Sequence, residues 1–169
     1  MMLSLRGWNG LNVDADPDAI RLFNELRPKD INVNYGVGAT NEVKSFYRFE
    51  VGAVSTLSSA QAKIWQEQHG WKLKETLPVR VRTANCILDE HLPPNCAIDF
   101  LNIDLEGLDR SVVTTIDFTR YRPSVIAIEL HGLQIKEAAN DPTIQHLQKL
   151  GYEIVAVCMA TYILRKANV

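Results

Sequence analysis

Short apolar runs alternate along this chain with segments whose apolar residues recur every three or four positions. The first pattern is typical of buried strands, and the second of helices that cover a sheet. Asp16-Pro17 and Asp141-Pro142 predict two helix starts, because Asp caps a helix and Pro suits its first turn. The alternation therefore predicts an α/β domain with a largely parallel sheet.

The predicted elements cover most of the chain. Two apolar segments near the C-terminus are separated by only a few residues, which predicts an antiparallel hairpin at one edge of the sheet. Thr83 is expected to cap a short helix. Strands are expected at 10–13, 31–37, 98–103 and 125–128, an antiparallel pair at 43–49 and 78–82, the hairpin at 152–157 and 161–164, and a helix at 108–116.

Between the antiparallel pair lies an insertion, Gly52–Lys74, that is longer than a turn requires. Long ordered loops are often functional, so we expect the insertion to shape the pocket for an acceptor substrate. Its residues Trp65 and Trp71 are more typical of core anchors than of substrate contacts.

Length and composition limit the class of protein. The 169 residues are 46% hydrophobic, which predicts one packed domain over residues 1–169. The net charge of −2 does not favour a nucleic-acid binder, and no apolar run has the length of a membrane span or a signal peptide. Three widely spaced cysteines predict reduced thiols and a cytoplasmic protein, and the four histidines lack ligand spacing, so no metal is expected.

Three predicted strands end in an acid, at Asp14, Asp104 and Glu129. In a parallel sheet such ends meet at the edge where α/β proteins bind ligands. Asp14 is a candidate for binding ribose hydroxyls, or it helps to cap the following helix. His131, just beyond Glu129, is a candidate general base or an ordinary loop residue.

A glycine-rich phosphate loop is not visible. Gly36-Val37-Gly38 is the single GxG, and a predicted hairpin follows it instead of a helix, so it fails as a dinucleotide fingerprint. The segment either lets the backbone turn close to a flat ligand such as adenine, or it is a simple turn. No Ser or Cys lies in a nucleophile elbow.

The strand-Asp-Leu-Glu-Gly segment at 98–107 and the Tyr-Arg-Pro strand at 117–129 form a pair that is more specific than either segment alone. Four further segments belong with this pair, at 7–17, 32–38, 151–153 and 162–165. Together the six segments resemble the FkbM-type family of class I S-adenosylmethionine-dependent methyltransferases. The resemblance covers nearly the whole chain.

The resemblance implies a Rossmann-like fold and transfer of a methyl group from S-adenosylmethionine to a hydroxyl of a small molecule, such as a sugar or secondary metabolite, or of a glycan. It implies that Asp14 binds ribose and that Tyr35, Gly36 and Val37 lie at the adenine pocket. Asp104 would lie near the methyl donor and acceptor, and Asp104 or His131 would take the acceptor proton. Glu106 and Gly107 would shape the strand-to-helix turn.

The chain departs from the family at its start. Members begin with a strand and an Asp-x-Gly-Ala-x-x-Gly loop, whereas this sequence begins after that loop, so we expect an N-terminally truncated version of the fold. In the family's topology the missing strand lies between the strands expected at 11–13 and 98–103, so its absence would leave a gap in the middle of the sheet. Either these two strands pair directly, or a second copy supplies a strand, or the chain is a fragment of a longer protein. A homo-oligomer is therefore one expectation. The rival hypotheses are a non-catalytic α/β fragment that acts through association and a nucleotide-binding module of another class.

Overall fold

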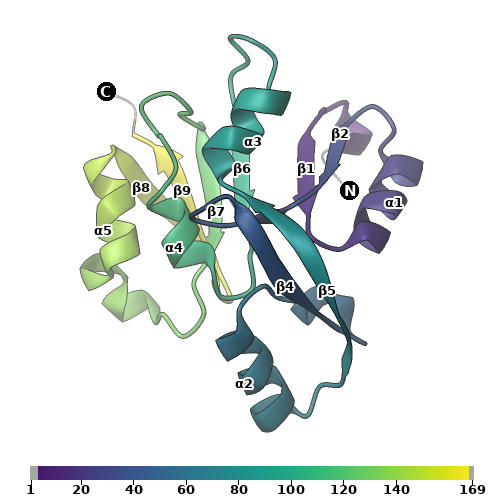
Figure 1. The fold of residues 1–169 in the computed structure, drawn as a ribbon. Helices are drawn as coiled ribbons and strands as arrows, with labels where there is room; N and C mark the ends of the chain where they lie inside the picture. The colour runs from purple at the N-terminus through teal and green to yellow at the C-terminus, as the bar shows by residue number, and fades with distance from the viewer. Residues whose placement is uncertain (1–3, 168–169) are drawn as a thin grey trace. The chain divides into compact units, whose positions relative to one another are not determined.

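The computed structural model describes residues 4–167, whose fold is drawn in Figure 1. These residues fall into two compact units, divided between Pro94 and Asn95. We call them unit 1 and unit 2. Each has its own strands, helices and buried side chains. The prediction of a single domain over residues 1–169 stays a prediction.

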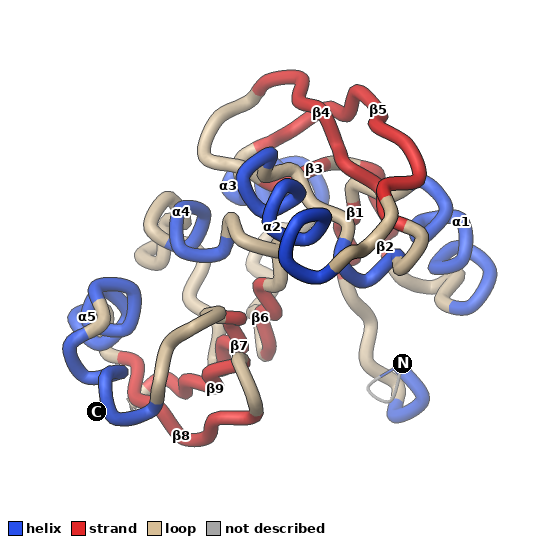
Figure 2. Tube along the Cα trace, turned by 90° about the horizontal axis from the view of Figure 1, so that it is seen from below, coloured by secondary structure: helices blue, strands red, loops and turns tan. Residues whose placement is uncertain are grey.

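Unit 1 begins with a parallel β-α-β segment. After a short 3-10 turn at Ser4–Arg6, β1 (Leu11–Asp14) leads into α1 (Pro17–Leu26) and then into β2 (Ile31–Asn34). The two strands pair in register from Leu11 with Ile31 to Asp14 with Asn34. The helix α1 lies against both strands (Figure 2). The predicted start of this helix is confirmed, since Asp16 accepts a hydrogen bond from the Asp18 N–H at 2.8 Å.

The rest of unit 1 is a three-stranded sheet with the insertion. β3 (Gly36–Val37) pairs parallel with β5 (Leu73–Arg82), which pairs antiparallel with β4 (Glu42–Phe49). The insertion contains a 3-10 turn at Gly52–Val54 and α2 (Ser59–His69). Trp65 packs with Phe49, Val54 and Ala62, and Trp71 packs against this cluster, so the prediction of core anchors is confirmed. α3 (Ala84–His91) begins at the predicted cap, Thr83.

Unit 2 is a four-stranded sheet in the order β6-β7-β9-β8. The strands are β6 (Phe100–Ile103), β7 (Val125–Glu129), β8 (Tyr152–Cys158) and β9 (Thr161–Lys166), and β6 and β7 are parallel. The helices are α4 (Asp109–Val113) and α5 (Pro142–Lys149), with a 3-10 helix at Ile135–Asn140. Ile128, Leu147 and Leu164 are fully buried in its core.

The prediction of a mostly parallel sheet is corrected to a mixed topology. The described strands form separate sheets with three parallel and three antiparallel pairings. The C-terminal hairpin is confirmed, and its two-residue turn requires β9 to run antiparallel to β8. β9 also pairs antiparallel with β7, which ends the parallel part of this sheet.

Several elements differ from their predicted bounds, and β5 begins at Leu73 instead of residue 78. The strand expected at 31–37 divides at Tyr35, because β2 pairs with β1 whereas β3 pairs with β5. The helix expected at 108–116 ends at Val113. Beyond it, the Thr114 and Thr115 hydroxyls donate to carbonyls three residues earlier, at 3.0 and 2.7 Å, which competes with helix continuation.

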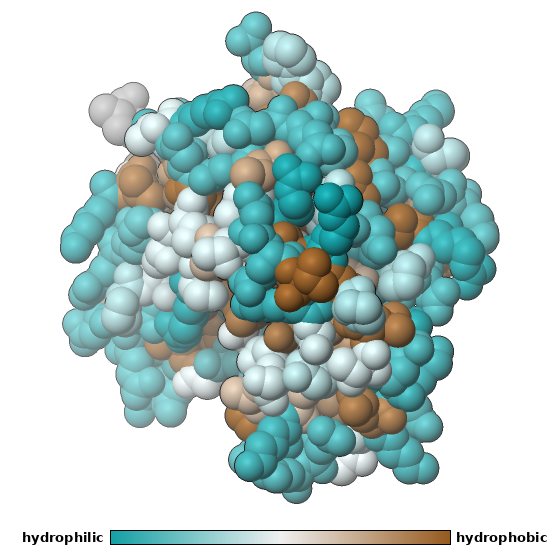
Figure 3. All heavy atoms as spheres, in the orientation of Figure 1, coloured by the Kyte–Doolittle hydropathy of each residue, from teal (hydrophilic) through white to brown (hydrophobic). Residues whose placement is uncertain are grey.

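The surface shown in Figure 3 is mostly hydrophilic, with apolar residues in small separate groups. None of the helices in residues 4–167 has the length and apolar character needed to cross a membrane.

Candidate functional site

Asp14 ends β1 in unit 1, where a ribose-binding acid was predicted. Its Oδ1 accepts a hydrogen bond from the Asp16 N–H at 2.8 Å, so the carboxylate also supports the entry into α1. Asn34, its partner in β2, donates from Nδ2 to the Asp14 and Ala15 carbonyls at 2.9 and 3.1 Å. These bonds fix the backbone at the carboxyl end of the β1–β2 pair. The capping role and the ribose role predicted for Asp14 are thus compatible, because a carboxylate has several acceptor positions.

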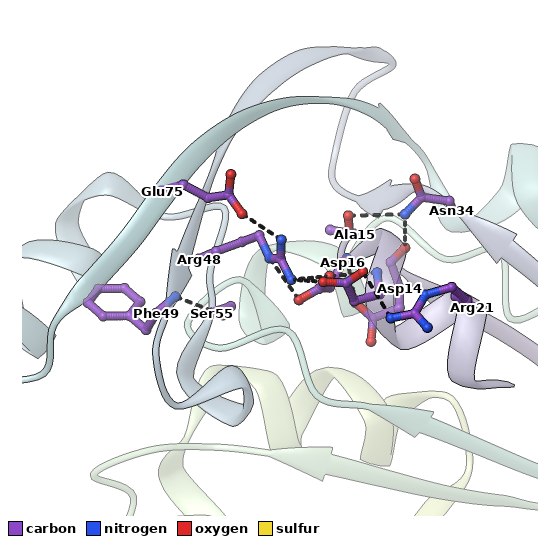
Figure 4. Close-up of polar contacts among 10 residues, drawn as sticks. Asp14, Ala15, Asp16, Arg21, Asn34, Arg48, Phe49, Ser55 and Glu75 are labelled. Carbon is purple, nitrogen blue, oxygen red and sulfur yellow. Dashed lines mark hydrogen bonds and ion pairs between the residues drawn. The ribbon is translucent and has the colours of Figure 1, made fainter.

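A nearly buried arginine on β4 braces the start of α1 (Figure 4). Arg48 donates from Nε to Asp16 at 3.0 Å, from Nη2 to Asp18 at 2.7 Å and from Nη1 to Glu75 at 2.6 Å. The hydrogen bond and charge of Arg48 lower the pKa of the Asp18 carboxyl. The hydrogen bond that Arg48 donates to Asp18 is also the largest cause that raises the pKa of Arg48. Arg48 therefore fixes the start of α1, while Asn34 fixes the backbone at the end of β1.

Tyr35, Gly36 and Val37, the predicted adenine-pocket residues, link the two sheets of unit 1. The Cζ of Arg82 lies 5.3 Å from the centroid of the half-buried Tyr35 ring. A Cβ on Gly36 would lie 2.7 Å from Leu57 Cδ1 and 3.0 Å from Val81 Cγ2. The glycine is therefore needed for packing against the β5 side chain. That packing explains Gly36 without an adenine ligand.

In unit 2, Asp104 and Glu129 come together at the carboxyl ends of two parallel strands. Ile103 pairs with Ile128, so each acid occupies the next position beyond that pair. Asp104 is exposed, while the Glu129 side chain keeps 19% of its accessible surface. The prediction that strand ends bring the acids together holds for Asp104 and Glu129, whereas Asp14 ends a strand of a separate sheet and is corrected in that respect.

The loop between β6 and α4 is organised by a carboxylate that the sequence reading overlooked. Asp109 is 3% exposed, and its two oxygens accept hydrogen bonds from the N–H groups of Leu105 at 2.8 Å and Gly107 at 3.2 Å. Between them, Glu106 has a φ of 46° and Gly107 a φ of 100°. Both lie in the left-handed region, which is costly for a non-glycine residue. The Asp109 carboxylate thus holds the turn that presents Glu106.

The Glu106 side chain lies with Glu129 and His131. One donor atom from each of the three residues lies within 4.8 Å of the others. His131 Nε2 is 2.9 Å from Glu129 Oε2 and 3.8 Å from Glu106 Oε2. Glu129 Oε2 is buried, and its contact with His131 lacks the geometry of a hydrogen bond. The structure therefore brings together His131, a predicted candidate, with Glu129 and the turn residue Glu106. We call these three residues the Glu-Glu-His cluster.

Burial and neighbouring negative charges raise the pKa values of the two carboxyl groups in the Glu-Glu-His cluster. Burial, followed by the charges of Glu129 and Asp104, raises the pKa of Glu106 from 4.5 to about 7. Burial and the Asp104 charge also raise the pKa of Glu129, against the opposing effect of His131. A carboxyl group with a pKa near neutrality can exchange protons at physiological pH. The cluster can therefore take up a proton or a cation.

The sequence reading missed three residues of these two regions in different ways. Arg48 had no local signal, because its partners lie about 30 positions away. Glu106 was assigned to the turn because a strand-Asp-Leu-Glu-Gly pattern does not show where the glutamate side chain points. Asp109 differs from an ordinary helix cap, because its carboxylate accepts N–H groups of residues that precede the helix, so no specific signal for it exists in the sequence.

Comparison with known protein families gives a match to the methyltransferase FkbM domain over residues 1–154. This chain therefore belongs to the FkbM methyltransferase family. Comparisons with curated proteins and with solved structures returned no match. The family resemblance read from the sequence is confirmed by this finding.

Proposed function

We propose that this protein is an S-adenosylmethionine-dependent O-methyltransferase acting on a hydroxyl of a sugar, glycan or secondary metabolite. The observation that carries the proposal is the family match over residues 1–154, which covers unit 1 and residues 95–154 of unit 2. The acids retained at the strand ends support it, because each belongs to a segment that resembles the family.

In unit 1, we assign the ribose hydroxyls of the cofactor to Asp14. Vicinal hydroxyls are hydrogen-bond donors, and a carboxylate at a strand end is a suitable bidentate acceptor. The Asp16 N–H and the Asn34 amide orient the Asp14 backbone and side chain in advance. The proposal places adenine beside Tyr35, Gly36 and Val37, where the aromatic ring offers a stacking surface.

The chemistry is displacement at the sulfonium methyl. The acceptor oxygen forms a bond to the methyl carbon as the carbon–sulfur bond breaks, and S-adenosylhomocysteine leaves with the electron pair. The hydroxyl proton passes to a base, for which Asp104 and His131 are the candidates. Both are exposed, so an acceptor can approach them. General-base catalysis of this kind contributes about 10²- to 10⁴-fold in rate.

A methyl-transfer assay tests the proposal. The chain is incubated with S-adenosylmethionine and a panel of hydroxyl, amine and thiol acceptors, and S-adenosylhomocysteine is quantified. We expect product with a hydroxyl acceptor, and a loss of about 10²-fold or more in kcat for Asp104→Asn or His131→Ala, whichever removes the base. Turnover that is unchanged in one variant removes that residue from the mechanism. Exclusive methylation of amines or thiols would contradict O-methylation.

A further inference from the structure

We infer that the Glu-Glu-His cluster of unit 2 is a binding site for one divalent transition-metal ion, such as Mn²⁺ or Zn²⁺. The inference goes beyond the proposed methyl transfer and does not depend on it. The spacing of the histidines along the chain gave no sign of such a site. Glu106 is distant in sequence from Glu129 and His131, and it reaches them through the pairing of β6 with β7 and the loop that follows β6.

The donor set fits a transition metal better than Mg²⁺ or Ca²⁺. The cluster offers the imidazole Nε2 of His131 and a carboxylate oxygen from each of Glu106 and Glu129, all within 4.8 Å of one another. Magnesium and calcium prefer oxygen ligands alone, whereas a mixed nitrogen and oxygen set suits zinc, manganese and iron. Three protein donors also leave coordination positions for water or another ligand.

The distances agree with donors that converge on one ion. With metal–ligand bonds of about 2.1 Å, neighbouring donors in a tetrahedral or octahedral sphere lie about 3.0 to 3.5 Å apart. The Glu129–His131 separation is 2.9 Å and the Glu106–His131 separation is 3.8 Å. The Glu106–Glu129 separation lies within 4.8 Å, so the Glu106 side chain would move toward the other two donors to complete the sphere.

The buried oxygen of Glu129 is a second, independent observation. Its Oε2 lies 2.9 Å from the imidazole nitrogen but is buried without a hydrogen bond among the described residues, while Asp104 is another polar neighbour of the Glu129 carboxyl. A buried polar atom without a hydrogen bond is costly and calls for an explanation. A cation that receives the lone pairs of both atoms provides one.

The elements that carry the donors are held in place. Leu130, between Glu129 and His131, is 1% exposed, and its N–H donates to the Ala160 carbonyl at 2.8 Å. On the other side, the two hydrogen bonds to Asp109 hold the loop of Glu106. The segments that carry the donors therefore lose little conformational freedom when an ion binds, and such preorganisation favours affinity.

Titration of the full chain with metal tests this inference. The protein is treated with EDTA, desalted and titrated with MnCl₂, while free Mn²⁺ is followed by its electron paramagnetic resonance signal. We expect one Mn²⁺ per chain, and binding at least tenfold weaker in Glu129→Gln and His131→Ala. Glu153→Gln, which removes an equal charge from an exposed glutamate paired with Arg165 at 3.0 Å, is the matched control and should bind normally.

Substitution with Co²⁺ identifies the ligands. We expect visible d–d bands whose position shifts in His131→Ala, because a nitrogen donor is replaced by water. His131→Gln, which keeps a polar side chain of similar size, is a second variant in which we expect the d–d bands to shift. Failure of the wild-type chain to bind Mn²⁺ and Zn²⁺ saturably would overturn the inference. Equal weakening in Glu153→Gln, or unchanged binding in both Glu129→Gln and His131→Ala, would also overturn it.

Discussion

At the scale of single residues, Asp109 shows how one buried side chain fixes a functional loop. Burial raises the pKa of its carboxyl, while hydrogen bonds from the Leu105 and Gly107 backbone oppose that shift. The same bonds hold Glu106 and Gly107 at positive φ. The loop conformation therefore depends on an acceptor outside its own backbone.

Replacing Asp109 should therefore cost stability in proportion to the acceptors removed. We expect Asp109→Ala, which leaves two loop N–H groups without their acceptor, to lower the free energy of unfolding by about 1 to 3 kcal/mol. Asp109→Asn keeps one carbonyl oxygen and should lose less. Urea denaturation measures both variants, and Ser111→Ala on the exposed side of α4 is the control. Equal stability of Asp109→Ala and the wild type would contradict the assigned role.

Glu106 predicts a pH dependence whose sign follows from its raised pKa. The folded value is about 7 and the ordinary value 4.5, so the folded state holds the proton more tightly than the unfolded state. The contribution is fully present below about pH 4.5 and is lost as the pH rises through 7. In the presence of EDTA, we expect the free energy of unfolding to fall by about 1 to 3 kcal/mol across this window because of Glu106.

Glu106→Gln is the variant that isolates this group, because glutamine is neutral at every pH. Denaturation curves at pH 5 and pH 8 should show a smaller difference for Glu106→Gln than for the wild type, with the variant more stable at pH 8. A wild type and a variant with the same pH dependence would show that Glu106 titrates normally in the folded chain.

At the scale of elements, the contact between β3 and β5 explains why glycines stand at 36 and 38. A Cβ on Gly38 would lie 2.6 Å from Val81 Cγ1, closer than real side chains approach. Val81 is 1% exposed, so it has little room to move. The two glycines of the Gly36-Val37-Gly38 segment are thus required by strand packing.

Gly38→Ala should consequently destabilise unit 1 by about 1 to 3 kcal/mol through overpacking. Gly52→Ala is a matched control, because a Cβ there meets nothing within 4 Å, and we expect a change within about 0.5 kcal/mol. Combining Gly38→Ala with Val81→Ala should recover part of the loss caused by the clash. Thermal denaturation of the four proteins measures these effects. A Gly38→Ala variant as stable as Gly52→Ala would rule out the packing explanation.

Arg48 on β4 contacts Glu75 on β5 and the acids at the start of α1. These contacts lead to a second prediction at the scale of secondary-structure elements. We expect Arg48→Ala to lower the free energy of unfolding by about 1 to 3 kcal/mol, because the half-buried Asp16 carboxylate loses its partner. Arg48→Lys keeps the charge but cannot reach three carboxylates at once, so its loss should be intermediate. Denaturation in urea at low and moderate salt measures both. Arg48→Ala with wild-type stability would show that the bonds in Figure 4 contribute little.

At the scale of the whole molecule, the features that neighbouring residues determine could be predicted from the sequence. The pairings between distant segments could not. The starts of α1 and α5 follow from Asp-Pro dipeptides, whose chemistry lies within four residues. The division of the 31–37 strand at Tyr35 depends on β5, more than 40 positions away. Likewise, the strand ends in the sequence identified Asp104 and His131 as candidates. That the Glu106 side chain lies near them follows only from the conformation of the loop after β6.

The central claim is that this member of the FkbM methyltransferase family binds the S-adenosyl nucleoside through Asp14. Calorimetric titration of the chain with S-adenosylhomocysteine tests it most directly. We expect saturable binding to the wild type and to Glu25→Gln, an exposed charge-matched control on α1, with binding at least tenfold weaker in Asp14→Ala. Absence of binding to the wild type, or equal affinity in Asp14→Ala, would contradict the account and favour a non-catalytic α/β protein.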